Sequence, residues 1–171
     1  VTISGGTIEK NTAAGSGGGI ATAVGLTIHD GVVISGNVAK AHNGGGIYFS
    51  ASESASNKSL VIYGGEVSGN ECYQYGGGIA VYNGNISISG GKILNNVAKT
   101  ISGGGLHLAA GTDEVTISDG LISKNSSTSG SGGGVSISGG TCEISGGAIS
   151  ENSSILGGGI NQNGGTLAIT G

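Results

Sequence analysis

Short runs of alternating apolar and polar residues recur along the chain, and glycine follows each of them. The stretch 86–108, ISISGGKILNNVAKTISGGGLHL, contains one full repeat. Ile86 and Ile88 have the period of two that places both side chains on one face of a short strand. Gly90 and Gly91 follow, then an Ile-x-x-Asn segment, and then Gly-Gly-Gly before the next apolar pair. The pattern predicts short strands separated by glycine-rich corners.

Three positions of this repeat form columns that run through the whole chain. The first column is the isoleucine of the alternating run: Ile3, Ile28, Ile62, Ile88, Ile117, Ile144 and Ile169. The second is an asparagine three residues after an aliphatic residue: Asn11, Asn37, Asn70, Asn96, Asn125 and Asn152. The third is the aliphatic residue that directly follows Gly-Gly-Gly: Ile20, Ile47, Ile79, Leu106, Val135 and Ile160. Such columns are typical of stacked repeats whose length differences fall in loops.

These columns predict an all-β fold, a right-handed single-stranded parallel β-helix with about six coils and three parallel sheets. The isoleucines of the first column are 25, 34, 26, 29, 27 and 25 residues apart, which gives six complete repeats. A helical repeat is disfavoured because glycines follow each strand-like run too closely, and crossovers between parallel strands are nearly always right-handed. We expect each ladder asparagine at a corner, where an amide can tolerate a left-handed conformation, and hydrogen-bonded to its neighbours about 4.8 Å away.

Composition narrows the classes of function. The 171 residues include 40 glycines and no proline, only 9% are charged, and arginine is absent. This argues against a nucleic-acid partner, because phosphate binding depends on clustered Lys and Arg. The chain contains no run of about 18 apolar residues, the length that a membrane-spanning helix needs. The chain starts and stops within the repeat, so we expect residues 1–171 to be one β-helix domain within a longer protein.

The paired motifs I-x-x-N and G-G-G-[ILV] resemble the F-x-x-N and G-G-A-[ILV] motifs of the polymorphic outer-membrane protein family. The resemblance covers essentially the whole chain, but Ile or Val replaces Phe and Gly replaces Ala. The passengers of that family are β-helical adhesins on bacterial surfaces. The resemblance therefore implies an extracellular, surface-displayed adhesive protein, and it says little about the ligand.

The aromatic residues are concentrated in the second and third repeats, beside the longest insertion, residues 50–59. Alternation predicts that Phe49 faces inward. It predicts an outward or corner position for the five tyrosines: Tyr48, Tyr63, Tyr73, Tyr75 and Tyr82. Exposed tyrosines around a protruding loop suit stacking on a glycan or contact with a host surface protein. The alternative is that these tyrosines only cover neighbouring coils, because tyrosine favours strands.

His29 and Asp30 form the other candidate binding pair, because Tyr63 of the next repeat is expected to stack over His29. Asp119 shares the column of Asp30 but lies three coils away, roughly 14 Å. That separation is too large for the carboxylate pair of a glycosidase, about 5 to 9.5 Å. The histidines lack the ligand spacing of a zinc site, and no cofactor or metal is expected. We also expect Lys124 and Glu151 to pair across adjacent coils, with little effect on stability.

Cys72 and Cys142 are the only two cysteines, and both fall at inward positions about three coils apart. This separation of roughly 14 Å exceeds the Cα separation of about 7 Å that a disulfide allows. Two free, buried thiols are therefore expected.

Together these features predict a structural and adhesive segment, without catalytic residues, that projects from a bacterial surface or presents a binding surface. Two alternatives remain at this point. One is a fragment of a carbohydrate-active β-helix enzyme. The other is a self-assembling filament, since uncapped strand edges favour end-to-end pairing.

Overall fold

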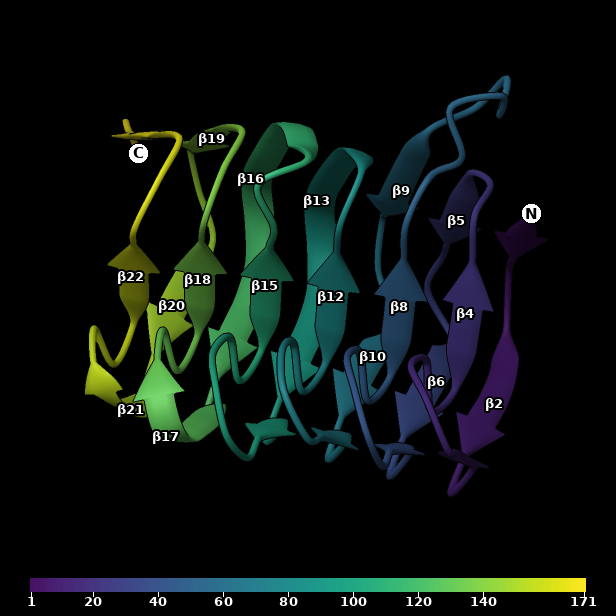
Figure 1. Ribbon diagram of the computed structural model, residues 1–171. Helices are drawn as coiled ribbons and strands as arrows, with labels where there is room; N and C mark the ends of the chain where they lie inside the picture. The colour runs from purple at the N-terminus through teal and green to yellow at the C-terminus, as the bar shows by residue number, and fades with distance from the viewer.

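The computed structural model describes all residues, 1–171, and contains 23 strands and no helix. Every strand pairing is parallel, and each strand pairs with its counterparts in the coils before and after it. Figure 1 shows the coils stacked side by side from the N-terminus to the C-terminus. The predicted parallel β-helix of about six coils is therefore confirmed. No helix is present that is long and apolar enough to cross a membrane.

The largest of the three sheets has eleven strands, and we call it sheet 1. Its strands are β1 (Thr2–Ile3), β2 (Gly6–Glu9), β5 (Leu26–Ile28), β6 (Val32–Ser35), β9 (Ser59–Ile62), β10 (Glu66–Ser68), β13 (Gly84–Leu94), β16 (Thr112–Ser123), β19 (Thr141–Ile144), β20 (Ala148–Ser150) and β23 (Thr166–Ile169).

The other two sheets have six strands each. Sheet 2 consists of β3 (Thr12–Ala13), β7 (Val38–Ala39), β11 (Glu71–Cys72), β14 (Val97–Ala98), β17 (Ser126–Ser131) and β21 (Ser153–Leu156). Sheet 3 consists of β4 (Ile20–Thr22), β8 (Ile47–Phe49), β12 (Ile79–Val81), β15 (Leu106–Leu108), β18 (Val135–Ile137) and β22 (Ile160–Gln162).

The winding is right-handed, as predicted. In Figure 1 the chain rises along the sheet 3 strands at the front, crosses to the back at the top and descends along the second half of sheet 1. It then turns through sheet 2 at the bottom and returns to the front one coil further toward the C-terminus. The loop between β8 and β9 projects above the coils at the N-terminal half.

The number of sheets agrees with the prediction, but their boundaries do not. The prediction places the isoleucine column and the aliphatic residue of the Ile-x-x-Asn segment in different sheets. In the structure, β13 contains both Ile88 and Ile93. Beyond Gly90 and Gly91, β13 continues to pair with the neighbouring strand β16. The register of this pairing shifts around the two glycines, which marks a bulge rather than a corner. Sheet 2 is the sheet that the prediction did not include, and its strands begin directly after the ladder asparagines.

The interior is filled by the aliphatic columns of sheets 1 and 3. Twenty-four buried side chains form one continuous cluster, in which Phe49 is completely buried, as predicted. Sheet 2 presents only small side chains inward, and Ala39, Cys72 and Ala98 form a separate cluster. The Gly-Gly-Gly segments lie directly against the backbone of sheet 2, which explains the small residues there. A Cβ on Gly104, for example, would come within 2.5 Å of the Ser126 carbonyl carbon and oxygen.

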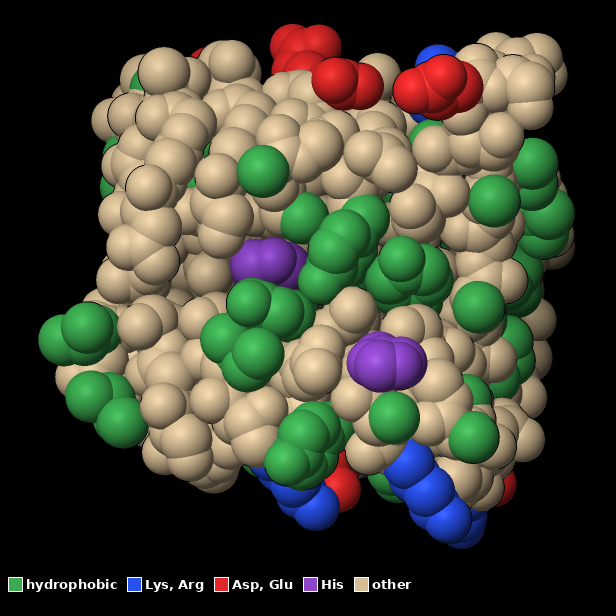
Figure 2. Space-filling view, viewed as in Figure 1, with side chains coloured by type: hydrophobic (Ala, Val, Ile, Leu, Met, Phe, Trp, Pro, Cys, Tyr) green, Lys and Arg blue, Asp and Glu red, His purple; other side chains and the backbone are tan.

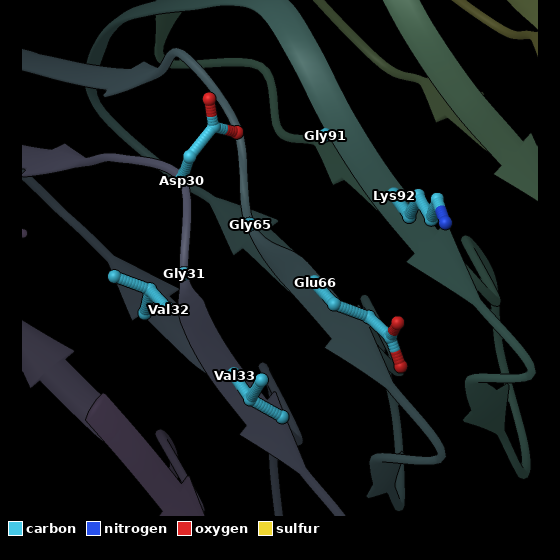
Figure 3. A pocket seen from close by; sticks show the side chains of 8 residues that line it. All are labelled: Asp30, Gly31, Val32, Val33, Gly65, Glu66, Gly91 and Lys92. Carbon is cyan, nitrogen blue, oxygen red and sulfur yellow. The ribbon is translucent and has the colours of Figure 1, made fainter. Parts of the chain in front are cut away.

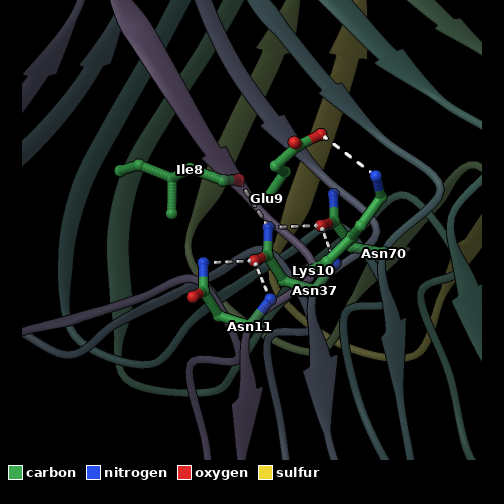
Figure 4. Close-up of polar contacts among 6 residues, drawn as sticks. All are labelled: Ile8, Glu9, Lys10, Asn11, Asn37 and Asn70. Atoms are coloured by element: carbon green, nitrogen blue, oxygen red, sulfur yellow. Dashed lines mark hydrogen bonds and ion pairs between the residues drawn. The ribbon is translucent and has the colours of Figure 1, made fainter.

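The asparagine ladder is confirmed, and each interior amide uses its full hydrogen-bonding capacity. Asn96 Oδ1 accepts from the backbone N and the Nδ2 of Asn70, at 2.9 and 3.0 Å. Asn96 Nδ2 donates to the Val67 carbonyl and to Asn125 Oδ1, both at 2.9 Å. Figure 4 shows the same arrangement at Asn11, Asn37 and Asn70. The four contacts match the two donors and two lone pairs of an amide.

The ladder asparagine could tolerate a left-handed conformation at this corner, but the residue before it is the one that adopts it. These preceding residues have φ between 54° and 62° in every coil: Lys10, Gly36, Gly69, Asn95, Lys124 and Glu151. The ladder asparagine itself needs ordinary backbone geometry, because its amide must point along the axis of the stack. Four of the six corners therefore place a non-glycine residue in a region that costs roughly 1 to 2 kcal/mol.

Candidate binding surface

The five tyrosines lie at three separate places on the molecule. Tyr48 lies on β8, Tyr82 directly follows β12, and Tyr75 lies at the corner before β12. These three come together on the outer face of sheet 3. Tyr63 follows β9 on sheet 1, and Tyr73 follows β11 on sheet 2, where their exposed fractions are 55% and 49%.

One outward position of sheet 3 recurs in register through all six coils. Its members are Ala21, Tyr48, Ala80, His107, Ser136 and Asn161. The Gly-Gly-Gly corner of each coil folds back over this position, and the Cβ of His107 lies 2.8 Å from where a Cβ on Gly103 would be. The central members are therefore buried, although their side chains do not face the core.

Four rings form a continuous row over these strands, and we call Tyr48, Tyr82, His107 and Tyr75 the aromatic row. The ring centroids of Tyr48 and Tyr82 are 5.5 Å apart, those of Tyr82 and His107 are 6.1 Å apart, and those of His107 and Tyr75 are 4.4 Å apart. These separations are typical of interacting aromatic rings. Figure 2 shows hydrophobic side chains gathered around a histidine on this face, over β8, β12 and β15.

His107 is the member of the row that sequence reasoning missed. It is only 3% exposed, and burial lowers its pKa to about 4, so the imidazole is neutral near pH 7. Its Nδ1 is buried without a hydrogen-bond partner. The alternation Leu106-His107-Leu108 places it on the opposite face from the two leucines, but alternation does not indicate what covers that face. Aligning the residue after each Gly-Gly-Gly-aliphatic segment would have placed it beside Tyr48 and Ala80.

The row carries no charge at neutral pH. Burial, with a smaller contribution from the neighbouring phenols of Tyr48 and Tyr75, raises the pKa of Tyr82 to about 12. The phenol therefore stays protonated and can donate a hydrogen bond. A neutral imidazole and three neutral phenols give a surface that is aromatic and polar but not ionic.

A hollow of about 330 Å³ continues the row toward the N-terminus. It is lined by Ala21, Thr22, Ala23, Tyr48 and Ser50, and none of these is charged. Ser50 is the first residue of the 50–59 loop, and its hydroxyl accepts a hydrogen bond from Asn83 Nδ2 at 3.2 Å. The base of this loop is thereby held at the edge of the hollow. One side of Tyr48 faces the row and the other faces open space.

The other candidate residues, His29 and Asp30, lie away from the aromatic row. The rings of His29 and Tyr63 are 5.2 Å apart, which confirms the predicted stacking. Asp30 lies in a different hollow of about 360 Å³ that also includes Glu66 and Lys92. Figure 3 shows that these three charged side chains do not point toward a common centre. No group of three metal-ligating side chains occurs anywhere in the chain.

The remaining predicted contacts are confirmed. Cys72 and Cys142 are free and buried, and burial raises their pKa values to about 12 and about 11. Lys124 Nζ lies 3.8 Å from Glu151 Oε2, and both side chains are more than half exposed. Neither feature forms part of a binding site.

The fold and this surface define a parallel β-helix that carries an uncharged aromatic patch on one outer face. Comparison with known proteins finds no matching family model, curated protein or solved structure. The similarity to polymorphic outer-membrane proteins stays a prediction from the repeat motifs.

Proposed function

We propose that this chain is a rigid, non-catalytic segment of a secreted or cell-surface bacterial protein, and that it presents the aromatic row as an adhesive surface for a glycan or a host surface protein. The observation that carries the proposal is the row itself: three tyrosines and a histidine, contributed by three coils, meet on one face beside an uncharged hollow. Aromatic residues with a polar group are enriched where proteins bind partners.

The surrounding architecture supports a binding role rather than a catalytic one. Binding sites are most precise on rigid elements, and the row lies on or directly beside β8, β12 and β15, which are fixed by backbone hydrogen bonds to neighbouring coils. The charged residues Asp30, Glu66 and Lys92 are spread over a different sheet and do not converge. A display role on a bacterial surface rests on the resemblance of the repeat motifs.

The test is binding to a mixed array of glycans and host surface proteins. A variant that combines Tyr48→Ser, Tyr75→Ser and Tyr82→Ser removes the tyrosines of the row. The matched control combines Tyr63→Ser and Tyr73→Ser, which removes two more exposed tyrosines outside it. We expect the parent and the control to bind the same targets and the triple variant to lose them while keeping its circular dichroism spectrum. Equal binding by all three proteins, or no binding by the parent, would refute the proposal.

A further inference from the structure

The aromatic row and the hollow beside Tyr48 together form a stripe that runs along the axis of the solenoid. The hollow lies over β4 and β8, and the row continues across β12 to β15. The same register position then continues as Ser136 and Asn161 in the last two coils. One end of the stripe is therefore aromatic and apolar, whereas at the other end Ser136 is buried and Asn161 is partly exposed.

We infer that this stripe binds an uncharged oligosaccharide chain that lies along the solenoid axis, an inference that rests on the adhesive function proposed above. A sugar ring has an apolar face that stacks on an aromatic ring and a rim of hydroxyl groups that need hydrogen-bond partners. The centroids of Tyr48 and Tyr82, 5.5 Å apart on adjacent coils, are separated by about the length of one pyranose unit.

The absence of charge on the stripe favours a neutral glycan over an acidic one. The lining of the hollow and the outward column contain Ala, Thr, Ser, Tyr, His and Asn, but no Lys, Arg, Asp or Glu. Recognition of sulfate or carboxylate groups would require a basic side chain to compensate their charge. A neutral ligand needs none.

Two buried polar atoms on the stripe support a ligand with hydroxyl groups. His107 Nδ1 and Asn161 Oδ1 are the only buried side-chain polar atoms of the whole chain without a hydrogen-bond partner, and both belong to this outward column. An unpaired buried polar atom is unfavourable and usually marks a site that a water molecule or a ligand completes.

A protruding loop borders one end of the stripe. The 50–59 loop lies at its N-terminal end, with Ser52 N donating to the Ala23 carbonyl at 2.9 Å and Ala51 N donating to the Asn83 carbonyl at 3.2 Å. These contacts hold the base of the loop against the wall of the hollow. The loop itself projects above the coils, so it borders the hollow beside the end of β8 rather than across the axis of the solenoid.

The experiment is calorimetric titration of the whole chain with neutral probes (cellohexaose, xylohexaose and mannohexaose) and with acidic probes (hexagalacturonate and a heparin hexasaccharide). We expect at least one neutral probe to bind, with an affinity that changes little between about 50 and about 500 mM salt, because no ion pair would be screened. Tyr82→Ala should weaken binding about ten-fold, which corresponds to ~1.4 kcal/mol, whereas Tyr63→Ala should leave it unchanged.

Conservative variants separate loss of stacking from loss of folding. Tyr82→Phe keeps the ring and should retain most of the affinity, and Tyr48→Ala tests the row at its more accessible end if Tyr82→Ala unfolds. Preference for the acidic probes, or a strong dependence on salt, would overturn the inference. So would binding to proteins alone on the mixed array, although that result would leave the adhesive function standing. If the parent bound nothing, both the inference and the proposed function would be lost.

Discussion

Replacing Asn96 by alanine tests how much the amide ladder stabilises the stack. The side chain is completely buried and makes four hydrogen bonds: two accepted from Asn70, one donated to the Val67 carbonyl and one donated to Asn125 Oδ1. Each contributes about 0.5 to 1.5 kcal/mol net, and unpaired partners left buried add to the cost. We therefore expect Asn96→Ala to lower the free energy of unfolding by about 4 kcal/mol.

Asn11 at the first coil provides the matched control. The same amide is exposed there, and its side chain makes a single hydrogen bond, from Nδ2 to Asn37 Oδ1 at 3.0 Å. Asn11→Ala should therefore cost less than about 1 kcal/mol. At roughly 2 to 4 °C of melting temperature per kcal/mol for a chain of this size, the two variants should differ by about 6 to 15 °C.

The assay is urea unfolding followed by circular dichroism, together with hydrogen exchange of the amides in β10 to β16. Hydrogen exchange is included because coils of a solenoid can unfold locally. Loss of protection should centre on the coils that contain Asn70, Asn96 and Asn125. If Asn96→Ala and Asn11→Ala lower stability by the same amount, the ladder does not stabilise the stack in the way described.

Two further predictions follow from the corners and the buried histidine. Gly104→Ala should lower the free energy of unfolding by about 2 to 3 kcal/mol, because the new Cβ would come within 2.5 Å of the Gly133 carbonyl oxygen. Gly158→Ala, at the same position of the last coil, should lower it much less, because the nearest atom is 3.0 Å away. Thermal melts of both variants check this, and equal costs would contradict it. His107, with its pKa lowered to about 4 by burial, takes up a proton on unfolding between pH 4 and about 6.5. Stability should fall by about 3 kcal/mol as the pH drops through that range, and His107→Ala, but not the exposed His42→Ala, should remove this loss in pH-dependent urea titrations; an unchanged slope would contradict the burial argument.

The fold could be predicted from the sequence where the repeat places large aliphatic residues. Ile88, Ile117 and Leu106 recur with spacings that only stacked coils satisfy, so the architecture and the buried columns could be predicted. Sheet 2 could not, because its inward residues are small, as at Ala39 and Ala98, and a column of small residues does not stand out from a loop. The reason for their size is the close approach of the Gly-Gly-Gly backbone, which only the structure reveals.

The candidate site was predictable residue by residue but not as an arrangement. Alternation placed Tyr48 and Tyr82 outward, as observed, and the columns placed Tyr63 on a different sheet from Tyr48. Neither could tell that Tyr75 at its corner meets His107, because the angle at each corner depends on backbone conformations. The left-handed corner residues illustrate this, since Lys124 and Glu151 carry no sequence signal for that conformation. The burial of His107 could not be predicted, because alternation says which way a side chain points but not what folds over it.

Because the ladder runs in one direction, each coil joins its neighbours in the same way and adds the same length to the solenoid. Between side-chain amides, each interior Nδ2 donates to the asparagine Oδ1 of the coil after it, while its second hydrogen bond goes to a carbonyl of the coil before it, and this pattern repeats at every internal junction of the ladder. Duplication or removal of a whole coil would therefore keep the ladder pattern, whereas removal of part of a coil would shift the asparagine out of its column. Each added coil would displace the aromatic row from the far end by a fixed step of about 4.8 Å, so that evolution could tune reach without altering recognition.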